Sequence, residues 1–304
     1  MAQVLISKQV SVCLKGLLAI MILIHHIYQN VLLGSDYSIV DYTLRSFGYW
    51  GVTTFFALSG YGLMYSVTQG GKEYFLKLKN KCVNMYFLTV FLIFLYWGTY
   101  SLLGIDVDTN RVMQSFLYGH TIIVAGWYLQ STILFYIGFL LLYKFDSSIL
   151  FYRNYTLFVV LYIIVIFLLK FPIHWYISCL GLPMGMYLYK YQDKLYSIFE
   201  SSYKFSFFLI LTLFLVSTIW IYLRPEIGVL GKVVKLSCQF LQGVWFALLV
   251  VVIVQKINIG GKVIGCLGKY SLEIFLLQGI AFSFLKNGIW EINNPVILFR
   301  YLLY

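Results

Sequence analysis

The stretch LKGLLAIMILIHHIYQN, Leu14–Asn30, lies within a longer apolar segment of about residues 10–33 and decides the class of fold. A segment of this length can cross a bilayer as a helix, because a span needs about 20 residues. It nevertheless carries Lys15, His25 and His26, and a charged side chain at the centre of a membrane helix costs about 2.5–3.5 kcal/mol. We therefore expect other helices to surround this segment and to compensate its polar side chains.

The composition predicts a polytopic membrane protein. Of the 304 residues, 61% are hydrophobic and 11% are charged, and the mean hydropathy is +0.85. An ordinary soluble domain is about 45–50% apolar and about 25% charged. A window of about 20 residues predicts an all-α transmembrane helix bundle with nine full spans. These lie at about residues 10–33, 48–69, 83–103, 121–143, 154–170, 172–190, 205–223, 236–255 and 270–286.

The two ends of the chain and its cysteines lead to further expectations. A tenth apolar stretch begins at Pro295 but is too short to span before Tyr304, so either the C-terminus is truncated or this segment lies in the interface. The first span is too long for a signal peptide and no small-residue cleavage site follows it, so we expect it to stay attached. The cysteines show no CxxC or metal-ligand spacing, so we interpret them as packing residues and predict no metal site. They are Cys13, Cys82, Cys179, Cys238 and Cys266.

The net charge of +11 indicates membrane orientation rather than nucleic-acid binding. With a cytoplasmic N-terminus, 13 of the 22 Lys and Arg residues fall in inner segments and seven in outer segments, while Lys15 and Arg300 lie within spans. This bias satisfies the positive-inside rule. The loops are short and contain no linker. We therefore predict one integral domain, residues 1–304, in the cell membrane, with the lipid bilayer as its surroundings and no soluble catalytic module.

Lys15 and His26 are predicted to share one face of the first span. Eleven residues at 100° each end about 20° past three full turns and cover about 16 Å along the axis, whereas His25 is rotated by about 100° from His26. Intramembrane ionisable groups usually mark function, so we interpret this face as a polar path inside the bundle. Two alternatives are that Lys15 snorkels to the inner headgroups and that the histidines only hydrogen-bond between helices.

These residues, together with five later segments, resemble the signature of the membrane acyltransferase-3 family. A basic residue, ten further residues and then a histidine are typical of that family's first span, and Lys15 and His26 have this spacing. The later segments follow in the family's order along almost the whole chain. They are FFALSGYGLMYS at 55–66, FLKLKNKCVNMYF at 75–87, GWYLQSTILFY at 126–136, SCLGLPMGMYLYK at 178–190 and GKYSLEIFLLQ at 268–278.

The resemblance implies an integral membrane O-acyltransferase without a bound cofactor. Such enzymes move an acyl group, usually acetyl, from cytoplasmic acyl-CoA to a hydroxyl of a carbohydrate acceptor. The acceptor class implied is a cell-envelope or secreted polysaccharide or its lipid-linked precursor. His26 matches the family's essential histidine, and a histidine suits a general base because it titrates near neutral pH. His25 is the second catalytic candidate, as a residue that orients His26 or binds substrate, with helix packing as its alternative.

The donor site is predicted near the inner ends of the helices. Lysines act as point charges for the phosphates of acyl-CoA, although such residues can also serve only to set topology. Glu273 lies about one turn into the ninth predicted span, where we expect it to pair with Lys15; the alternative is a surface pair with Lys269 at i,i+4. The lysines that follow the second span are Lys77, Lys79 and Lys81.

Four more residues complete the predicted substrate and donor site. Ser59 is interpreted as a small packing residue, with an acyl-enzyme nucleophile as the alternative. Trp127 and Tyr128 are expected either in the aromatic belt of the membrane interface or against a sugar ring. Gln278 stands where the family has a late histidine, and it can form hydrogen bonds but cannot carry a proton.

The sequence leaves two other functions open. A transporter or flippase for a glycolipid or small solute could use Lys15 and His26 as a proton-coupled path. The chain shows no internal inverted repeat or paired broken helices, which many transporters have. An inactive homologue that serves assembly is the other alternative, and it is raised by Gln278 and by the loose spacing of the lysines.

Overall fold

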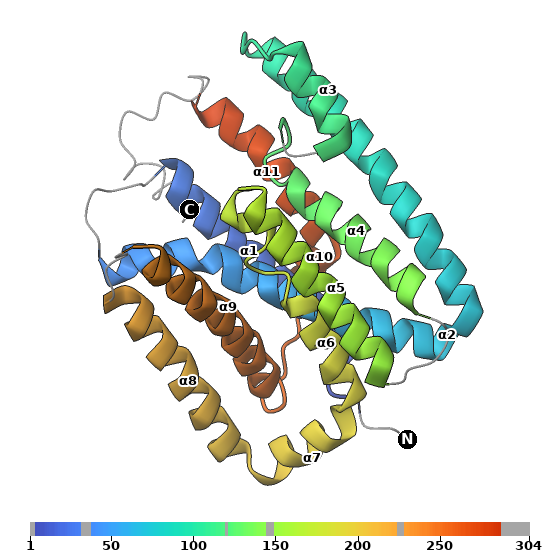
Figure 1. Ribbon diagram of the computed structural model, residues 1–304, viewed down its shortest axis with the longest axis vertical. Coiled ribbons are helices and arrows are strands. Elements are labelled where there is room, and N and C mark those ends of the chain that lie inside the picture. Colours follow the sequence, from blue (N-terminus) through green and yellow to red (C-terminus); the bar gives the residue numbers. More distant parts are fainter. Residues whose placement is uncertain (1–3, 32–37, 119–120, 144–148, 224–227, 287–304) are drawn as a thin grey trace.

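The computed structural model describes residues 4–31, 38–118, 121–143, 149–223 and 228–286. These residues form an all-α bundle, which confirms the predicted fold class, and none of the five ranges contains a strand (Figure 1). The predicted tenth segment from Pro295 lies outside the described residues. The helices are α1 (Lys8–Val31), α2 (Ile39–Leu102), α3 (Thr109–Tyr118), α4 (Gly126–Leu142), α5 (Ile149–Leu168), the short 3₁₀ helix η1 (Ile173–Trp175), α6 (Gly181–Lys190), α7 (Gln192–Ser201), α8 (Tyr203–Leu223), α9 (Gly228–Ile253), α10 (Lys262–Lys269) and α11 (Ser271–Lys286).

The structure does not confirm nine full spans. Within the described ranges, five helices are long and apolar enough to cross a membrane, or six if α10 and α11, bent by 73°, cross as one unit. The segment 172–190 is wrong as a single span because it forms η1 and the ten-residue α6. Pro172 separates this segment from α5, since proline lacks the N–H that a continuous helix requires, and residues 176–180 between η1 and α6 form turns. The segments 121–143 and 270–286 contain helices of 17 and 16 residues. The cytoplasmic N-terminus stays a prediction.

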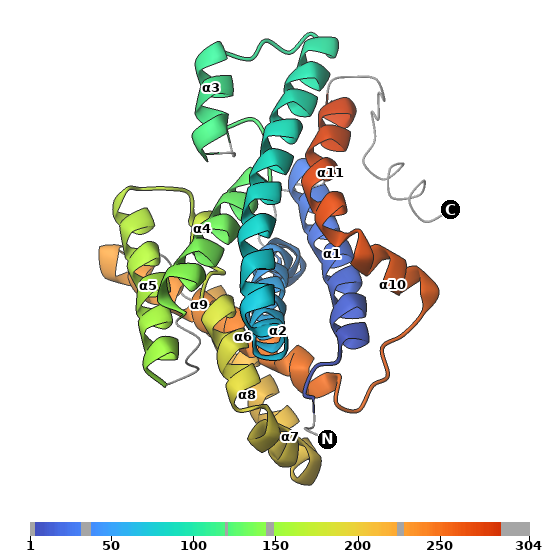
Figure 2. The ribbon, with the colours of Figure 1, turned by 90° about the vertical axis from the view of Figure 1, so that its right-hand side faces the viewer.

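The long helix α2 consists of two arms that meet at Gly71. This glycine has φ 51° and ψ −135°, a conformation that residues with a Cβ atom rarely adopt. A straight helix of 64 residues would extend about 96 Å, roughly three times the hydrocarbon thickness of a bilayer. Figures 1 and 2 show the two arms running in different directions. The predicted segments 48–69 and 83–103 lie on opposite sides of this bend.

Glycines allow α2 and α6 to cross at close range. A Cβ atom at Gly60 would lie 2.1 Å from the carbonyl oxygen of Leu182, and one at Gly185 would lie 1.9 Å from that of Ala57. The helices α1 and α10 meet in the same way at Gly268. Small residues at helix crossings are typical of membrane bundles, where close van der Waals packing drives association.

The outer surfaces of α5 and α8 are apolar. On α8, Phe205 and Phe208 are 70% and 62% exposed, and on α5, Leu161 and Leu168 are 59% and 68% exposed. Soluble proteins rarely expose apolar faces of this extent. Together with the apolar helices, these faces indicate a multi-pass membrane protein whose α5 and α8 contact lipid.

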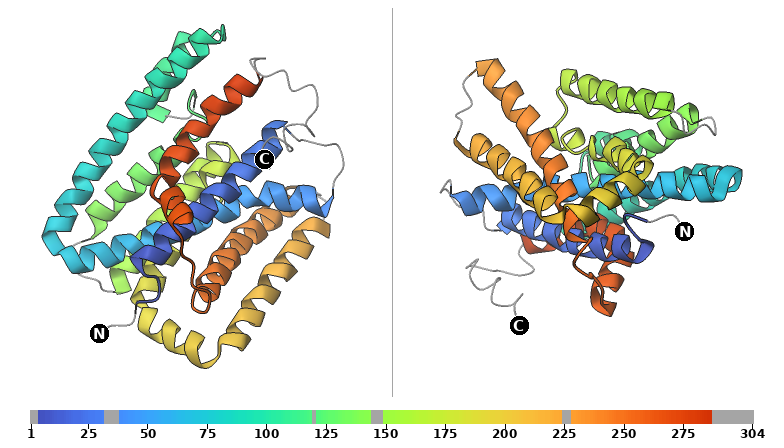
Figure 3. Two further views of the ribbon diagram at one scale, coloured as in Figure 1. Left: turned by 180° about the vertical axis from the view of Figure 1, so that it is seen from behind. Right: turned by 90° about the horizontal axis from the view of Figure 1, so that it is seen from below.

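The first helix is enclosed by the elements that form the polar interior. α1 packs against α2, α10 and α11, and α2 also packs against α4. Figure 2 shows α1 between α2 and the bent pair α10 and α11, and Figure 3 shows α1 and α11 side by side from behind. The polar residues of α1 can therefore face neighbouring helices instead of lipid, as the polar side chains of this segment require.

We predict that Gly60→Ala destabilises the bundle and that Gly62→Ala, on the same helix, does not. A methyl group at Gly60 would overlap the carbonyl oxygen of Leu182, whereas no atom lies within 4 Å of the corresponding position at Gly62. Overpacking typically costs about 1–3 kcal/mol, so the midpoint of thermal unfolding in detergent should fall for Gly60→Ala alone. Equal midpoints would show that α2 and α6 can separate without cost.

Candidate active site

Two adjoining cavities lie inside the bundle, and α1 contributes to both. Lys15 lines the first cavity, of about 160 Å³, and His26 lines the second, of about 640 Å³. Ile22, Val52 and Phe275 line both cavities and therefore form the wall between them. The structure places Lys15 and His26 on the two sides of this shared wall.

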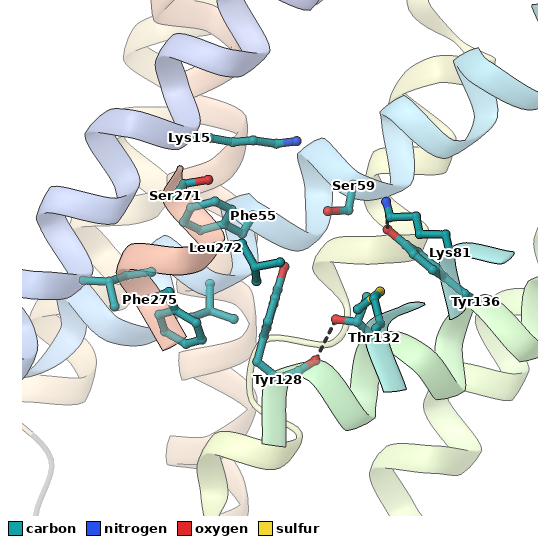
Figure 4. Close-up of a pocket in the computed structure, with 13 residues that line it drawn as sticks. Lys15, Phe55, Ser59, Lys81, Tyr128, Thr132, Tyr136, Ser271, Leu272 and Phe275 are labelled. Carbon is teal, nitrogen blue, oxygen red and sulfur yellow. Dashed lines mark hydrogen bonds between the residues drawn. The ribbon is translucent and has the colours of Figure 1, made fainter. Parts of the chain in front are cut away.

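Lys15 and Lys81 are the cationic side chains of the first cavity. Figure 4 shows both side chains pointing toward Ser59, Lys15 from α1 and Lys81 from the second arm of α2. The Lys81 ammonium lies 3.4 Å from the Tyr136 hydroxyl and 4.9 Å from the centre of its ring. The cavity thus combines two positive charges with hydroxyl groups. The other residues that line it are Phe55, Met85, Tyr128, Thr132, Ser271 and Leu272.

The predicted pair of Lys15 and Glu273 is wrong. Glu273 is exposed, and neither residue takes part in the ion pairs found in the described ranges. The reason is helical phase, because Ser271 and Phe275 of α11 face the first cavity and Glu273 is turned away from it. The alternative pair with Lys269 is also not formed there, since a bend of 73° separates α10 from α11. The charge of Lys15 is therefore free of any acidic partner among the described residues.

The three predicted donor lysines occupy different environments. Lys81 lines the first cavity, whereas Lys77 is exposed and forms a 2.5 Å ion pair with Glu73. Lys79 is exposed as well, since two residues correspond to a rotation of about 200° from Lys81. The structure therefore brings only Lys81 to the cavity and leaves Lys77 and Lys79 on the surface of the helix.

His25 and His26 both line the second cavity, with ring centres 4.9 Å apart. The Nδ1 atom of His25 lies 2.9 Å from the carbonyl oxygen of Leu44, and because a carbonyl only accepts, Nδ1 donates the proton. A Cβ atom at Gly48 would lie 2.5 Å from His25 Nε2, so the ring fills the space between α1 and α2. His26 lies at the wall, 6.4 Å from the ring centre of Phe275. His25 thus has a packing role in the structure, and His26 is the histidine next to the first cavity.

Adjacent residues at the start of α4 lie on opposite sides of the wall. Trp127 lines the second cavity, and its ring centre is 5.3 Å from that of His174. Tyr128 lines the first cavity, and its ring centre is 5.3 Å from that of Phe275. Trp127 is only 7% exposed, which contradicts a place in the lipid-facing aromatic belt. His174, which sequence reasoning passed over, faces the same cavity as His26.

Ser59 and Gln278 differ in their relation to the cavities. Ser59 lines the first cavity, which supports access to a ligand. Gln278 is buried, donates from its amide to the carbonyl oxygen of Phe275 at 2.9 Å, and lines neither cavity. The structure therefore does not bring Gln278 to the candidate active site.

Sequence reasoning also missed polar residues of the second cavity. Arg45 lines this cavity and lies 2.9 Å from the carboxylate of Asp41, which is only 3% exposed. Tyr42 and Tyr49 line it too, and their hydroxyls donate to the amide oxygen of Gln242. The i,i+4 spacing of Asp41 and Arg45 is a pattern that the sequence contains. By contrast, Gln242 is 200 residues away from Tyr42, and no local pattern connects them.

Comparison with known proteins identifies the class of this apolar bundle. The family model described as an acyltransferase domain, that of the acyltransferase-3 family, matches residues 13–304. The chain therefore belongs to the acyltransferase-3 family, and it is a membrane acyltransferase. Searches of curated proteins and of solved structures found no match.

We predict that acyl transfer depends on the positive charge of Lys15. Lys15→Arg should retain much of the activity, whereas Lys15→Met should lose most of it, because methionine removes the charge from the first cavity. The Lys15→Met protein should also reach higher abundance, since an apolar side chain favours insertion of α1. The measurement is activity per amount of inserted protein. Full activity of Lys15→Met would reduce Lys15 to a snorkelling residue.

Proposed function

We propose that this protein is an integral membrane O-acyltransferase that moves acetyl from cytoplasmic acyl-CoA to a hydroxyl of a carbohydrate. The acceptor class is a cell-envelope or secreted polysaccharide or its lipid-linked precursor. The observation that carries the proposal is the pair of adjoining cavities, with Lys15 and Lys81 in one and His26 in the other. This arrangement supports a donor site and an acceptor site that meet at one wall.

The first cavity suits the acyl thioester end of the donor. Its volume of about 160 Å³ is below the roughly 300–1,000 Å³ typical of complete small-molecule sites, which favours a short acyl group and leaves the nucleotide outside. Lys77 and Lys79 are exposed near this cavity's Lys81, where they can bind the phosphates as point charges. Lys15 and Lys81 can stabilise the negative charge that develops on the thioester carbonyl oxygen.

The second cavity suits the acceptor and its deprotonation. Neutral His26 takes the proton of the acceptor hydroxyl while the hydroxyl oxygen attacks the thioester carbonyl carbon. The carbon–sulfur bond then breaks, the ester forms, and the departing thiolate takes up the proton to give CoA. Ser59 lines only the donor cavity, and direct transfer to the acceptor hydroxyl requires no seryl intermediate. Trp127 offers an aromatic face against which a sugar ring can pack.

The proposed orientation follows from the donor. Acyl-CoA is cytoplasmic, so the Lys15 end of α1 faces the cytoplasm and the His26 end faces outward, in the cell membrane. The 13-to-7 distribution of basic residues supports the same orientation by the positive-inside rule.

The test of the function uses purified protein, labelled acetyl-CoA and a panel of sugars, without any membrane gradient. We expect transfer of label to a sugar hydroxyl together with release of CoA. Transfer under these conditions excludes a transporter that only moves its substrate. Absence of transfer to every sugar, with intact folded protein, would contradict the proposal.

We predict that the two histidines respond differently to substitution. His26→Ala should lower the rate by about 10²–10⁴-fold, the usual contribution of a general base, while donor binding stays nearly intact because the donor lies beyond the wall. His25→Ala should cost much less activity, because His25 is held by the carbonyl of Leu44 and acts in packing.

The pH dependence provides a further readout for His26. The wild-type rate should rise with pH through the titration of a histidine, since only the neutral ring accepts a proton. This rise should be missing from the residual activity of His26→Ala. An inactive His25→Ala beside a normal His26→Ala would contradict the assignment.

We predict that Lys81→Gln raises the KM for acyl-CoA more than Lys79→Gln does. Lys81 lines the donor cavity, while Lys79 lines none of the three cavities and its contribution is weakened by salt. Initial rates at several donor and salt concentrations measure this difference. The triple variant of Lys77, Lys79 and Lys81 should show the largest KM. An inverted topology with unchanged donor binding would show that these lysines only set orientation.

A further inference from the structure

A third cavity, of about 410 Å³, lies beyond the histidine end of α1. It is formed between the second arm of α2, α3, the segment before α4, and α11, which lie together at one end of the molecule in Figure 2. The residues that line it are Asn30, Tyr100, Ile105, Asp106, Val107, Arg111, Thr121, Ile122, Val124, Gly279, Phe282 and Ser283. The reaction proposed above makes no use of this space.

The third cavity adjoins the second cavity. Asn30 and Val124 line both of them, just as three other residues line both the first and the second. Asn30 lies one turn beyond His26 on α1, and its amide nitrogen donates to the His26 carbonyl oxygen at 2.7 Å. Its amide oxygen is not used in this hydrogen bond and can accept one from a ligand. The three cavities thus form a continuous series along α1.

The polar groups of the third cavity suit a neutral polyhydroxylated ligand. Asp106 is exposed and lies outside every ion pair and hydrogen bond found in the described ranges. Arg111 donates to the carbonyl oxygen of Thr121 at 3.0 Å, which leaves other guanidinium protons available. One carboxylate, one guanidinium and the Asn30 amide offer acceptors and donors with no net charge. Sugar hydroxyls use both kinds of group, whereas an anionic ligand would be repelled by Asp106.

We propose that the third cavity is a subsite for a second sugar unit of the acceptor, bound through Asp106. This inference rests on the proposed function and deepens it. The sugar that reacts occupies the second cavity beside His26, and the neighbouring unit passes Asn30 and Val124 into the third cavity. Both cavities fall within the roughly 300–1,000 Å³ of small-molecule sites. The acceptor is therefore a glycan of at least two units, and a single sugar fills only part of the site.

The test compares the methyl glycosides of glucose, galactose and N-acetylglucosamine with their disaccharides on the full-length protein. Binding is measured without donor, and kcat/KM is measured with acetyl-CoA. In the wild type, a disaccharide should bind at least about tenfold more tightly than its monosaccharide, since hydrogen bonds to a charged group carry that much energy. Asp106→Asn should remove this advantage and leave the monosaccharide values unchanged.

Asp108→Asn is the matched control. Asp108 lines none of the three cavities, and its carboxylate accepts from the backbone N–H of Asn110 at 3.0 Å, a contact that asparagine retains. This variant should keep the length dependence of the wild type. Thermal unfolding of both variants checks that the fold is intact. The comparison of monosaccharide and disaccharide binding by the wild type requires no variant.

Each outcome of the test supports or overturns the subsite. Three results would overturn it. The first is equal binding of monosaccharides and disaccharides, and the second is no binding of any glycan. The third is that Asp106→Asn weakens the binding of monosaccharides and disaccharides equally. Length-dependent binding without acyl transfer would retain the subsite and reject the proposed function. The same disaccharide carried on a polyprenyl diphosphate shows whether the unit that enters the third cavity belongs to a lipid-linked precursor or to a free chain.

Discussion

The cost of placing polar side chains of α1 in a membrane constrains the rest of the bundle. A lysine and two histidines on a helix in hydrocarbon are tolerated only where protein or a polar cavity faces them. α1 is accordingly packed against α2, α10 and α11, and its close contact with α10 depends on a glycine at position 268. The polar groups open into cavities between these helices, and the lipid-facing surfaces are left to apolar helices such as α5 and α8.

The wall between the first two cavities separates Lys15 and Lys81 from His26. The two lysines lie on the side where an anionic donor would enter. His26 lies on the side proposed for the sugar, which Arg45 and Lys235 also line. In the proposed reaction the thioester and the acceptor hydroxyl meet at Ile22, Val52 and Phe275, whose side chains are apolar. Exclusion of water is a general way to prevent hydrolysis of an activated group, and apolar side chains at this wall are suited to it.

Composition and the periodicity of α1 were sufficient to predict part of the fold and part of the candidate site. The all-α membrane fold follows from the apolar content, and 3.6 residues per turn predict that Lys15 and His26 share a face of α1, whereas the structure places them in two adjoining cavities. The number of spans did not follow, because a hydropathy window does not register that residues 172–190 divide into η1 and α6. It also does not register that the helices within 121–143 and 270–286 have only 17 and 16 residues. The failure at Glu273 has a related cause, since the bend between α10 and α11 sets which face of α11 meets the cavity. The pair of Asp41 and Arg45 could have been predicted from its i,i+4 spacing. The contacts of Gln242 could not, because they join helices that are far apart in the sequence.

The position of the wall along α1 limits which insertions the segment between Lys15 and His26 can accept. One residue inserted between Lys15 and His26 would rotate the imidazole by about 100° and turn it away from the acceptor cavity. Two or three inserted residues would still leave the two side chains on different faces of the helix or shifted along its axis. Insertion of a full turn would restore the direction but would move the histidine by about 5.4 Å along the axis, past the wall. Substitutions of the intervening apolar residues change neither the rotation nor the axial distance between the two side chains. The number of residues between the lysine and the histidine is thus fixed by the geometry of the helix, and Gly16 and Ile22 among them are also constrained by the contact with α10 and by the wall.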